Sequence, residues 1–324
     1  MYLTFYGLAE KPFNPTPDPR FLYMSPGHRE ALAQLQYGVQ ERKGFIVLTG
    51  EVGTGKTTLL HALMQRLNGQ TAISFGFNSA LTFEGLLEYA LNDFGVPYPR
   101  DSRVQQVITL NNFLIERERE GQNSVLVLDE AQNLDAATLE QVRLLSNFET
   151  PTRKLLQIVL VGQPELRAKL DLPQLRQLKQ RVGLRCRISP LTTAEAGAYI
   201  RTRLRIAGSR DLGVFTDTAV DRIVEYSGGI PRLINIVSDH CLLFGYADQK
   251  RRIDRQTVRQ AIDYLEGGLS VHRKVRTPRA GTAGRLRWYL GTLGVALATA
   301  AAVLAVRFDA TLLGFVHPVR YLFR

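Results

Sequence analysis

Cysteine is scarce in this sequence: the two residues present, Cys186 and Cys241, are too few for a disulfide framework. Both lie in apolar surroundings without a Cys-x-x-Cys spacing, as buried structural thiols of a reducing compartment do, so no disulfide is expected. The five histidines show no ligand spacing with cysteine or acidic residues, which argues against a protein-bound zinc site. A long apolar run is missing from residues 1–20, so no signal peptide is expected.

Acidic residues are fewer than basic ones, with 30 Asp and Glu against 41 Lys and Arg, and the formal charge is +11. Beyond residue 264, nine basic residues stand against two acidic ones, so residues 1–264 carry a charge of only +4. The basic charge is therefore concentrated beyond residue 264. This weakens the interpretation of residues 1–264 as a nucleic-acid-binding unit. Hydrophobic residues make up 45% of the 324 residues, which suits a globular protein of about two domains.

A glycine-rich loop, Gly-Glu-Val-Gly-Thr-Gly-Lys-Thr, occupies residues 50–57 between an apolar run and a helix-prone stretch. The order strand, glycine loop, helix is typical of a phosphate cradle, in which loop N–H groups and the positive helix end face the phosphates. Lys56 adds a cation, and the Thr57 hydroxyl can ligate Mg²⁺. A plain glycine-rich turn is disfavoured because every motif position is filled. The predicted nucleotide-binding residues are Gly50, Gly53, Thr54, Gly55, Lys56, Thr57 and Thr58.

Short strand candidates alternate with helical patterns, which predicts a parallel sheet covered by helices on both faces. The strands are expected over 45–48, 72–77, 125–128, 156–161 and 186–188, and the helices over 27–43, 83–94, 102–120, 136–148 and 174–182. Ligands of such sheets gather at the carboxyl ends of the strands. Residues 1–25 mix prolines with aromatic residues and predict an extended strap, which either lines the adenine or is purely structural.

After Pro190 the pattern is helical only. Thr192 and Glu195 predict a capping box that opens a helix to Ala207, and further helices are expected over 218–226, 231–246 and 255–266. These helices predict a small lid over 191–266. The following segment mixes Gly, Pro, Thr and basic residues without periodicity, which is typical of a flexible linker.

Residues 288–306 hold no charge over nineteen positions, which at 1.5 Å per residue spans roughly 28 Å. This length predicts one membrane-spanning helix, with a buried soluble helix as the alternative. Six basic residues stand within fifteen residues before it, against Arg307 and Arg320 after it. The positive-inside rule therefore predicts a single-pass protein of the inner (cytoplasmic) membrane with its large N-terminal part in the cytoplasm.

The chain thus divides into six predicted segments. They are a strap (1–25), an α/β nucleotide-binding domain (26–190), a helical lid (191–266), a basic linker (267–287), a transmembrane helix (288–306) and a short tail (307–324).

A second nucleotide-related signature is an apolar strand over 125–128 that ends in two acids, Asp129 and Glu130. Asp129 would hold Mg²⁺ through its waters, and Glu130 would orient and deprotonate the attacking water. An acidic pair that closes a strand is also common as a solvated turn, but the glycine loop upstream favours catalysis.

Together, the glycine loop, the acidic pair and the helical lid resemble an AAA+ ATPase. More narrowly, residues 1–266 resemble the general secretion pathway protein A type, a family that includes ATPases associated with secretion, MSHA pili and exosortase systems. The likeness implies a P-loop NTPase sheet followed by a lid, with ATP and Mg²⁺ as cofactors. It rests on Phe5-Tyr6-Gly7-Leu8, Lys11-Pro12-Phe13, Gly44-Phe45, Leu-Val-Gly-Gln-Pro-Glu-Leu over 160–166, Gln180-Arg181 and Gly228-Gly229-Ile230-Pro231-Arg232.

The resemblance also implies roles for single residues. Gln163 matches the first sensor, which would hydrogen-bond the γ-phosphate or the lytic water; the alternative is a plain loop amide at a strand end. Arg232 matches the second sensor in the lid, and the alternative is a solvent-exposed arginine. Arg181 matches the arginine that a neighbouring subunit inserts into the active site, with Arg185 as second choice. This basic cluster could instead be a solvated face or an anion site. The resemblance implies a homo-oligomer, whose isolated monomers should hydrolyse ATP slowly.

The favoured interpretation is a membrane-anchored ATPase that drives or switches assembly of an envelope secretion, pilus or exopolysaccharide system, with inner-membrane assembly proteins as partners. Related chains often continue into a periplasmic peptidoglycan-binding module, whereas about eighteen residues follow Val306, which argues against direct cell-wall binding and leaves open whether the short tail contacts the cell wall. One alternative is a DNA-associated ATPase of the transposition-helper type, against which the near-neutral charge of residues 1–264 and the membrane span argue. Another is a nucleotide-gated scaffold whose hydrolysis is incidental.

Overall fold

The computed structural model describes residues 2–14, 18–76 and 82–270. The chain forms two compact units, Met1–Tyr264 and Leu265–Arg324. None of the helices within the described residues is long and apolar enough to cross a membrane. The predicted transmembrane helix over 288–306 lies outside the described residues, together with the predicted tail and most of the predicted linker.

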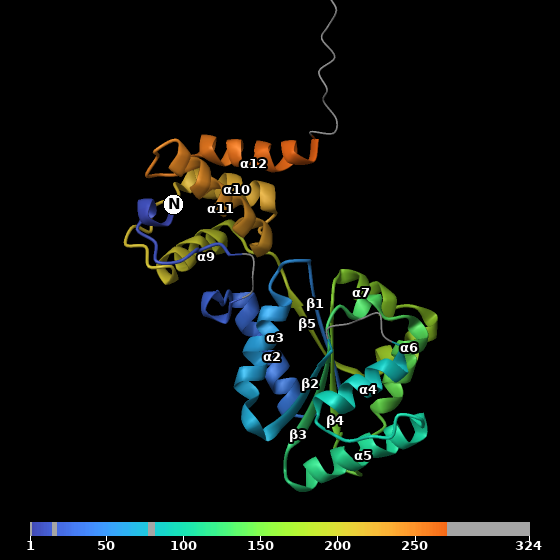
Figure 1. The fold of residues 1–324 in the computed structure, drawn as a ribbon. Helices are drawn as coiled ribbons and strands as arrows, with labels where there is room; N and C mark the ends of the chain where they lie inside the picture. Colours follow the sequence, from blue (N-terminus) through green and yellow to red (C-terminus); the bar gives the residue numbers. More distant parts are fainter. Residues whose placement is uncertain (1, 15–17, 77–81, 271–324) are drawn as a thin grey trace, which may run out of the picture. The chain divides into compact units, whose positions relative to one another are not determined.

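A five-stranded parallel sheet with the strand order β2-β3-β4-β1-β5 forms the centre of the first unit (Figure 1). This arrangement confirms the parallel sheet expected from the sequence. The strands are β1 (Phe45–Gly50), β2 (Thr71–Gly76), β3 (Asn123–Leu128), β4 (Leu156–Gly162) and β5 (Val182–Ile188). The register pairs Leu128 with Leu160, and Thr49 with Gly162, so β1, β3 and β4 end close to one another. The loops that follow these three strands therefore meet at one edge of the sheet.

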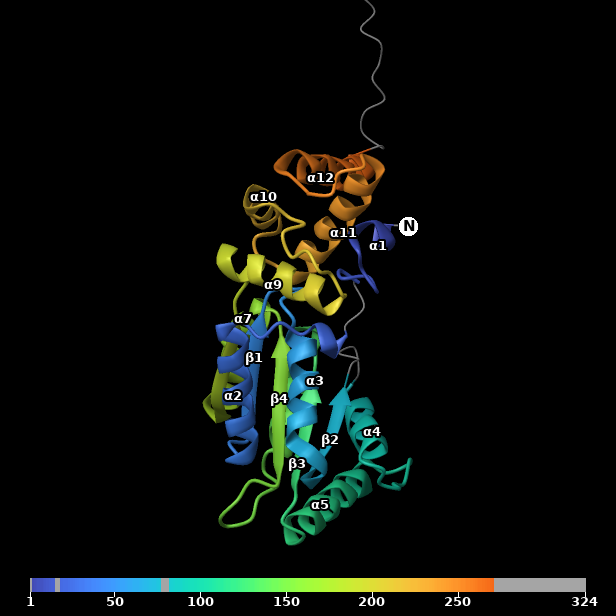
Figure 2. The same ribbon diagram turned by 90° about the vertical axis from the view of Figure 1, so that its left-hand side faces the viewer.

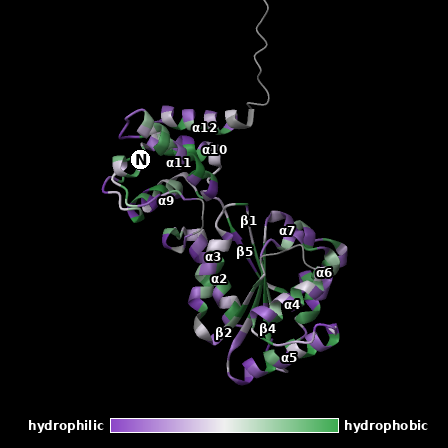
Figure 3. Cartoon of the chain, in the orientation of Figure 1, coloured by the Kyte–Doolittle hydropathy of each residue, from purple (hydrophilic) through white to green (hydrophobic). Residues whose placement is uncertain are grey.

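Helices cover both faces of the sheet. Two helices, α2 (Pro26–Gln40) and α3 (Lys56–Leu67), lie along one face (Figure 2). The other face carries α4 (Phe83–Asp93), α5 (Arg103–Arg119), α6 (Ala136–Leu145), α7 (Pro164–Leu170) and α8 (Arg176–Arg181). Successive side chains of β1 point to opposite faces, so Ile46 and Leu48 belong to the first core while Phe45 and Val47 belong to the second. Hydrophobic residues accordingly line the strands and the inner sides of the helices (Figure 3).

Two predictions for the end of the sheet domain are wrong. The fifth strand was expected over 186–188 but begins at Val182. Its first half was missed because β5 is an edge strand, in which exposed Gly183 and Arg185 interrupt the apolar pattern. The single helix expected over 174–182 is a 3₁₀ turn followed by α8, and its last residue already belongs to the strand.

Two short helices were not expected. The seven residues of α7 bury only Leu166 and Leu170, which is too few for a recognisable helical period. The strap, expected to be extended, contains α1 (Tyr2–Tyr6) and the 3₁₀ turn η1 (Pro19–Phe21).

Beyond the sheet the chain is helical, as predicted, with α9 (Thr193–Ile206), α10 (Asp217–Ser227), α11 (Pro231–Ala247) and α12 (Arg255–Ser270). The segment from Leu191 through these helices is called the helical part below. The predicted capping box is present at the start of α9, where Thr192 and Glu195 satisfy each other's backbone N–H groups. The strap lies against these helices. The Tyr6 hydroxyl donates to the Lys250 carbonyl at 2.9 Å, and the Ala9 N–H donates to the Ala207 carbonyl at 2.8 Å.

Both cysteines are free and buried. Burial raises the pKa of the Cys186 thiol to about 12 and also raises the pKa of Cys241. Neither thiol therefore carries the thiolate character that reactive cysteines need.

Candidate functional site

The glycine loop connects β1 to α3 and folds back on itself. Lys56, the first residue of α3, is 5% exposed, and its Nζ donates to the carbonyls of Gly50 at 2.9 Å and Glu51 at 3.1 Å. Burial lowers the pKa of Lys56, although the carboxylates of Glu130 and Asp129 act in the opposite direction. The loop thus holds a buried ammonium group at the positive end of a helix, which is a strong anion-binding arrangement.

Glycine is required at the loop positions that the sequence singled out. Gly53 and Gly55 have φ angles of 81° and 96°, a region that side-chain-bearing residues rarely adopt. A Cβ atom at Gly50 would lie 2.9 Å from the Ile188 carbonyl oxygen, and one at Gly53 would lie 2.6 Å from the Cβ of Arg232. The loop backbone is therefore packed so closely against β5 and α11 that a side chain at Gly50 or Gly53 would not fit.

A hydroxyl and a carboxylate lie side by side next to the loop. Thr57, in the first turn of α3, donates its hydroxyl to Asp129 Oδ2 at 2.9 Å, and the Asp129 side chain is buried. Asp129 follows β3, whereas Thr57 comes after β1, and both strands pair with β4 between them. The parallel sheet therefore brings the two residues together although 72 positions separate them. Hard oxygen ligands of this kind suit Mg²⁺, so the pair fits the metal that accompanies a nucleotide triphosphate.

The Glu130 carboxylate is held by two amide groups. Gln132 Nε2 donates to Glu130 Oε2 at 2.6 Å, and Gln163 Nε2 donates to the same oxygen at 3.3 Å. The backbone N–H of Gln163 in turn donates to Gln132 Oε1 at 3.1 Å. Glu130 adopts a left-handed φ of 54°, a strained conformation of the kind that clusters at functional sites. Gln132 was not identified from the sequence, although it lies only two residues beyond the acidic pair.

Arg232 lies where the helical part meets the loop. It follows Pro231 at the start of α11, and its backbone N–H donates to the Gly53 carbonyl at 3.2 Å. The structure therefore brings the predicted second-sensor position into direct contact with the glycine loop.

A pocket of about 430 Å³ lies beside the loop. The loop side of its wall comprises residues 52–58 and Glu130, which includes the predicted Thr54, Thr57 and Thr58. The remaining wall comes from the strap, the start of α2 and the helical part: Asn14, Asp18, Phe21, Leu22, Tyr23, His28, Leu191, Tyr199, Arg203, Pro231, Arg232 and Asn235. The volume falls within the range typical of small-molecule sites.

Most of the pocket residues from the strap, α2 and the helical part were not predicted from the sequence. The sequence left open whether the strap lines the adenine or is purely structural. The strap residues in this wall are compatible with the first role. Arg203 ties the strap to the wall: the guanidinium donates to the Asn14 carbonyl at 3.5 Å and lies 4.8 Å above the Phe21 ring centroid. The cluster of aromatic residues between strap prolines was the available signal, whereas nothing local marked Tyr199, Arg203 or Asn235.

Arg181 lies away from the glycine loop of its own chain, whereas Arg185 pairs with Val47 in the middle of β1. Arg181 directly precedes Val182, which pairs with Phe45 at the beginning of β1, whereas the loop follows the end of β1. About six residues of strand separate the two ends, roughly 20 Å. The Arg181 guanidinium donates to the Ser146 hydroxyl at 2.7 Å, and Arg185 is exposed on β5. Because Arg181 lies this far from the loop of its own chain, its action on nucleotide would have to take place in a neighbouring chain.

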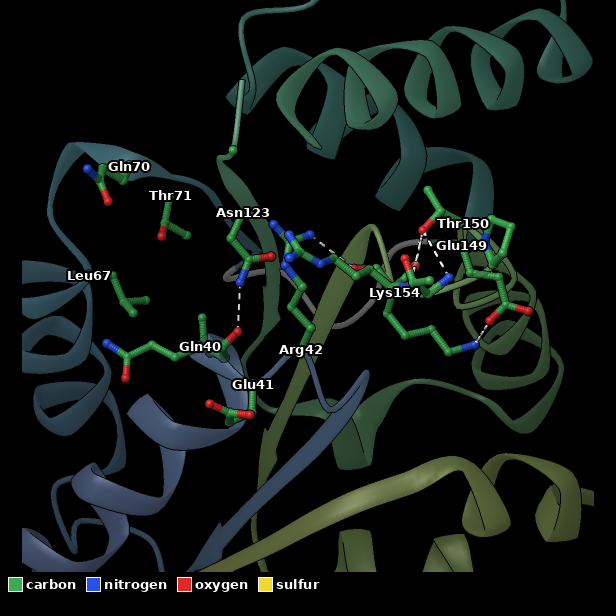
Figure 4. Close-up of a pocket in the computed structure, with 15 residues that line it drawn as sticks. Gln40, Glu41, Arg42, Leu67, Gln70, Thr71, Asn123, Glu149, Thr150 and Lys154 are labelled. Carbon is green, nitrogen blue, oxygen red and sulfur yellow. Dashed lines mark hydrogen bonds and ion pairs between the residues drawn. The ribbon is translucent and has the colours of Figure 1, made fainter. Parts of the chain in front are cut away.

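A larger hollow of about 890 Å³ lies at the opposite end of the sheet (Figure 4). Its basic groups are already paired: Arg42 donates to the carbonyls of Gln122 at 3.0 Å and Lys154 at 3.3 Å, Arg153 forms an ion pair with Glu118, and Lys154 forms one with Glu149. Because it lies at the amino ends of β2 and β3, it is remote from the glycine loop, Asp129 and Glu130. The smaller pocket is therefore the candidate nucleotide site.

The sequence is similar to that of known proteins. Residues 39–170 match the family model described as AAA domain. Over 254 residues, 78% of this chain, the sequence is 45% identical to general secretion pathway protein A of Aeromonas hydrophila, and the match spans 46% of that protein. The chain therefore spans about half the length of this relative.

Solved structures show the same fold at lower identity. The ORC2 protein of Aeropyrum pernix in ADPNP-ADP complexes superimposes with a TM-score of 0.58 at 19% identity, covering 79% of this chain and 72% of that one. Drosophila ORC bound to DNA gives a TM-score of 0.61 at 16% identity, covering 85% of this chain and 70% of that one. These likenesses concern the fold alone. With its phosphate loop, its acidic pair and its close relative in sequence, the chain belongs to the AAA+ ATPases of the general secretion pathway protein A type.

Proposed function

We propose that this protein binds ATP with Mg²⁺ and hydrolyses it, using the free energy to drive or switch an assembly at the bacterial inner membrane. The observation that carries the ATPase proposal is the convergence of Lys56, the Thr57–Asp129 pair and Glu130 at one edge of the sheet. Lys56 and Thr57 begin the helix after β1, whereas Asp129 and Glu130 directly follow β3. Each has the chemistry that a phosphoryl-transfer site needs.

The residues divide the work by their chemistry. The loop amides and Lys56 bind and orient the phosphates, and Glu130 takes the proton of the attacking water. Mg²⁺, when bound by Thr57 and Asp129, supplies charge neutralisation at the phosphates. Gln163 acts as the first sensor, since its amide already contacts the carboxylate that activates water. Arg232 acts as the second sensor and reports nucleotide occupancy to the lid.

Magnesium dependence provides the direct test of the ATPase proposal. Phosphate release from ATP by the full chain should fall at least about a hundredfold when Mg²⁺ is removed with EDTA, because the charge of the triphosphate is then no longer compensated. Restoring Mg²⁺ in excess of the chelator should restore the rate. Equal rates in EDTA and in Mg²⁺ would show that the Thr57–Asp129 pair does not serve a metal.

The arginine next to β5 supports a proposal about assembly. We infer that Arg181 completes the nucleotide site of a neighbouring copy, because it is exposed and lies at the far end of the sheet from the loop of its own chain. Arg185 is the second choice. Active protein would then be a homo-oligomer, and dilution to monomers should slow hydrolysis.

The assembly that uses the energy is proposed from the relative's name and from the sequence beyond the described residues. General secretion pathway protein A is named for secretion, and residues 288–306 have the length and apolarity of a single membrane span. We infer an envelope secretion, pilus or exopolysaccharide system as the partner, with the ATPase part on the cytoplasmic side.

Membrane attachment can be tested by fractionation. The full chain should sediment with the membranes, whereas a variant that lacks residues 285–324 should remain mostly in the soluble fraction, because it has lost the apolar stretch and part of the basic flank. ATP turnover per chain in detergent serves as the control for folding of both proteins. An unchanged soluble share after truncation would contradict the anchor.

A further inference from the structure

His28 connects the start of α2 to the glycine loop. It lies in the first turn of α2, just after the strap, and its side chain is 3% exposed. Its Nε2 lies 2.9 Å from the Thr54 carbonyl oxygen, and its Nδ1 lies 2.7 Å from the Ser25 hydroxyl. Both ring nitrogens are therefore engaged, one by the loop and one by the residue that caps α2.

The partners fix which nitrogen carries the hydrogen. A carbonyl oxygen can only accept, so Nε2 must donate to Thr54. In the neutral ring Nδ1 then accepts from the Ser25 hydroxyl, whose oxygen also accepts the His28 backbone N–H at 3.2 Å. Burial lowers the pKa of His28, which favours this neutral form. The ring is thus held as a neutral donor aimed at one loop carbonyl.

The bond to Thr54 has a consequence for the next residue. A peptide unit is planar and trans, so the carbonyl of Thr54 and the N–H of Gly55 point in opposite directions. When His28 holds the carbonyl on its own side, the Gly55 N–H must point away from it. Gly55 directly precedes α3, where backbone N–H groups have no partner within the helix and are available to an anion.

The residue after this carbonyl is a glycine, whose backbone has unusual conformational freedom. Gly55 has a φ of 96°, and glycine lacks the side-chain sterics that would select one orientation of the peptide. The preceding carbonyl, that of Gly53, is already held from the helical part by the Arg232 N–H at 3.2 Å. His28 and Arg232 therefore fix consecutive carbonyls of the loop from two different elements.

We propose that His28 is a positioning residue of the nucleotide site, which holds the Thr54–Gly55 peptide so that the Gly55 N–H is presented to a phosphate before ATP arrives. The inference rests on the proposed ATPase function. Because the contact prepares the loop for binding and touches no reacting atom, its loss should weaken ATP binding while hydrolysis of bound ATP continues.

The experiment compares two replacements of His28 in the full chain. His28→Leu fills the same space without a donor, and His28→Gln retains an amide N–H that can reach the Thr54 carbonyl. A matched control is His240→Gln, because the ring of His240 also faces a backbone carbonyl, that of Ile236 on α11, but lies outside the pocket wall. The measurements are the Kd of a fluorescent ATP analogue, together with KM and kcat for ATP.

His28→Leu should raise Kd and KM about tenfold and leave kcat within about threefold, since a binding interaction is lost. His28→Gln should recover most of the affinity, and His240→Gln should match the wild type. If His28→Leu does not fold, Ser25→Ala, which keeps the ring but removes its orienting partner, should still raise Kd about threefold.

Three results would overturn the inference: an unchanged Kd in His28→Leu, equal weakening in the folded leucine and glutamine variants, or an equal loss in His240→Gln. Wild-type protein that neither binds nor hydrolyses ATP would instead overturn the proposed function, and this inference with it. Binding by the wild type therefore separates the two failures.

Discussion

Replacement of Glu130 with glutamine should lower the kcat for ATP hydrolysis by at least about a hundredfold while ATP remains bound, because an amide cannot accept the proton of the attacking water. The site favours this separation of binding from chemistry. Glu130 is fixed by the amides of Gln132 and Gln163 at 2.6 and 3.3 Å, and neither of these belongs to the phosphate loop. The loop itself should therefore keep its shape in the variant.

The measurement combines phosphate release with the Kd of an ATP analogue. Glu165→Gln is the matched control, because Glu165 is an exposed carboxylate of α7 near the same edge of the sheet. Turnover within fivefold of the wild type in Glu130→Gln would exclude Glu130 as the general base, whereas the same loss in both variants would indicate a general effect of charge.

Replacement of Lys56 with alanine should reduce ATP turnover by at least about a hundredfold, since it removes the buried cation that the phosphates require. Arg181→Ala should cause a loss of similar size for a different reason. The variant chain keeps an intact phosphate loop, but it supplies no arginine to the nucleotide site of the neighbouring chain. The two inactive proteins are therefore defective in complementary ways.

Mixing them tests the intersubunit site directly. An equimolar mixture should regain activity well above either variant alone, because Lys56→Ala chains supply Arg181 to the intact loops of Arg181→Ala chains. A double variant, Lys56→Ala with Arg181→Ala, is the control and should rescue neither partner. If mixed oligomers form but remain inactive, Arg181 is not the group that acts between chains, and Arg185→Ala in the same mixture tests the second choice.

The part of the site that the sequence predicted is encoded in short contiguous segments. A phosphate loop needs glycines, a lysine and a threonine at fixed spacing, and an acidic pair at the end of an apolar strand is equally local. The parallel sheet then brings these segments together, because strands that are buried on both faces stand out as apolar runs and end at a common edge.

The part that the sequence did not reveal depends on contacts between distant segments. The pocket wall joins Asn14, His28 and Arg203, which come from three elements and have no common spacing. Local signals also failed on β5, where exposed Arg185 lies between half-buried Leu184 and buried Cys186. They failed again in α7, which is too short to show a helical repeat. The apolar pattern records burial, so partly exposed elements leave a weak pattern.

Along the chain, the strap gives the helices α9 to α11 a second connection to the sheet domain. One connection is the chain between β5 and α9, and the other is the strap, which is bonded to the helical part through Ala9 and Pro12 and continues through η1, in contact with both α3 and α9, into α2. A body attached at one point can swivel about any axis, whereas a body attached at two points can turn only about the line that joins them. Any movement of the helical part over the pocket should therefore be a hinge rotation about a single axis rather than an unrestricted tilt.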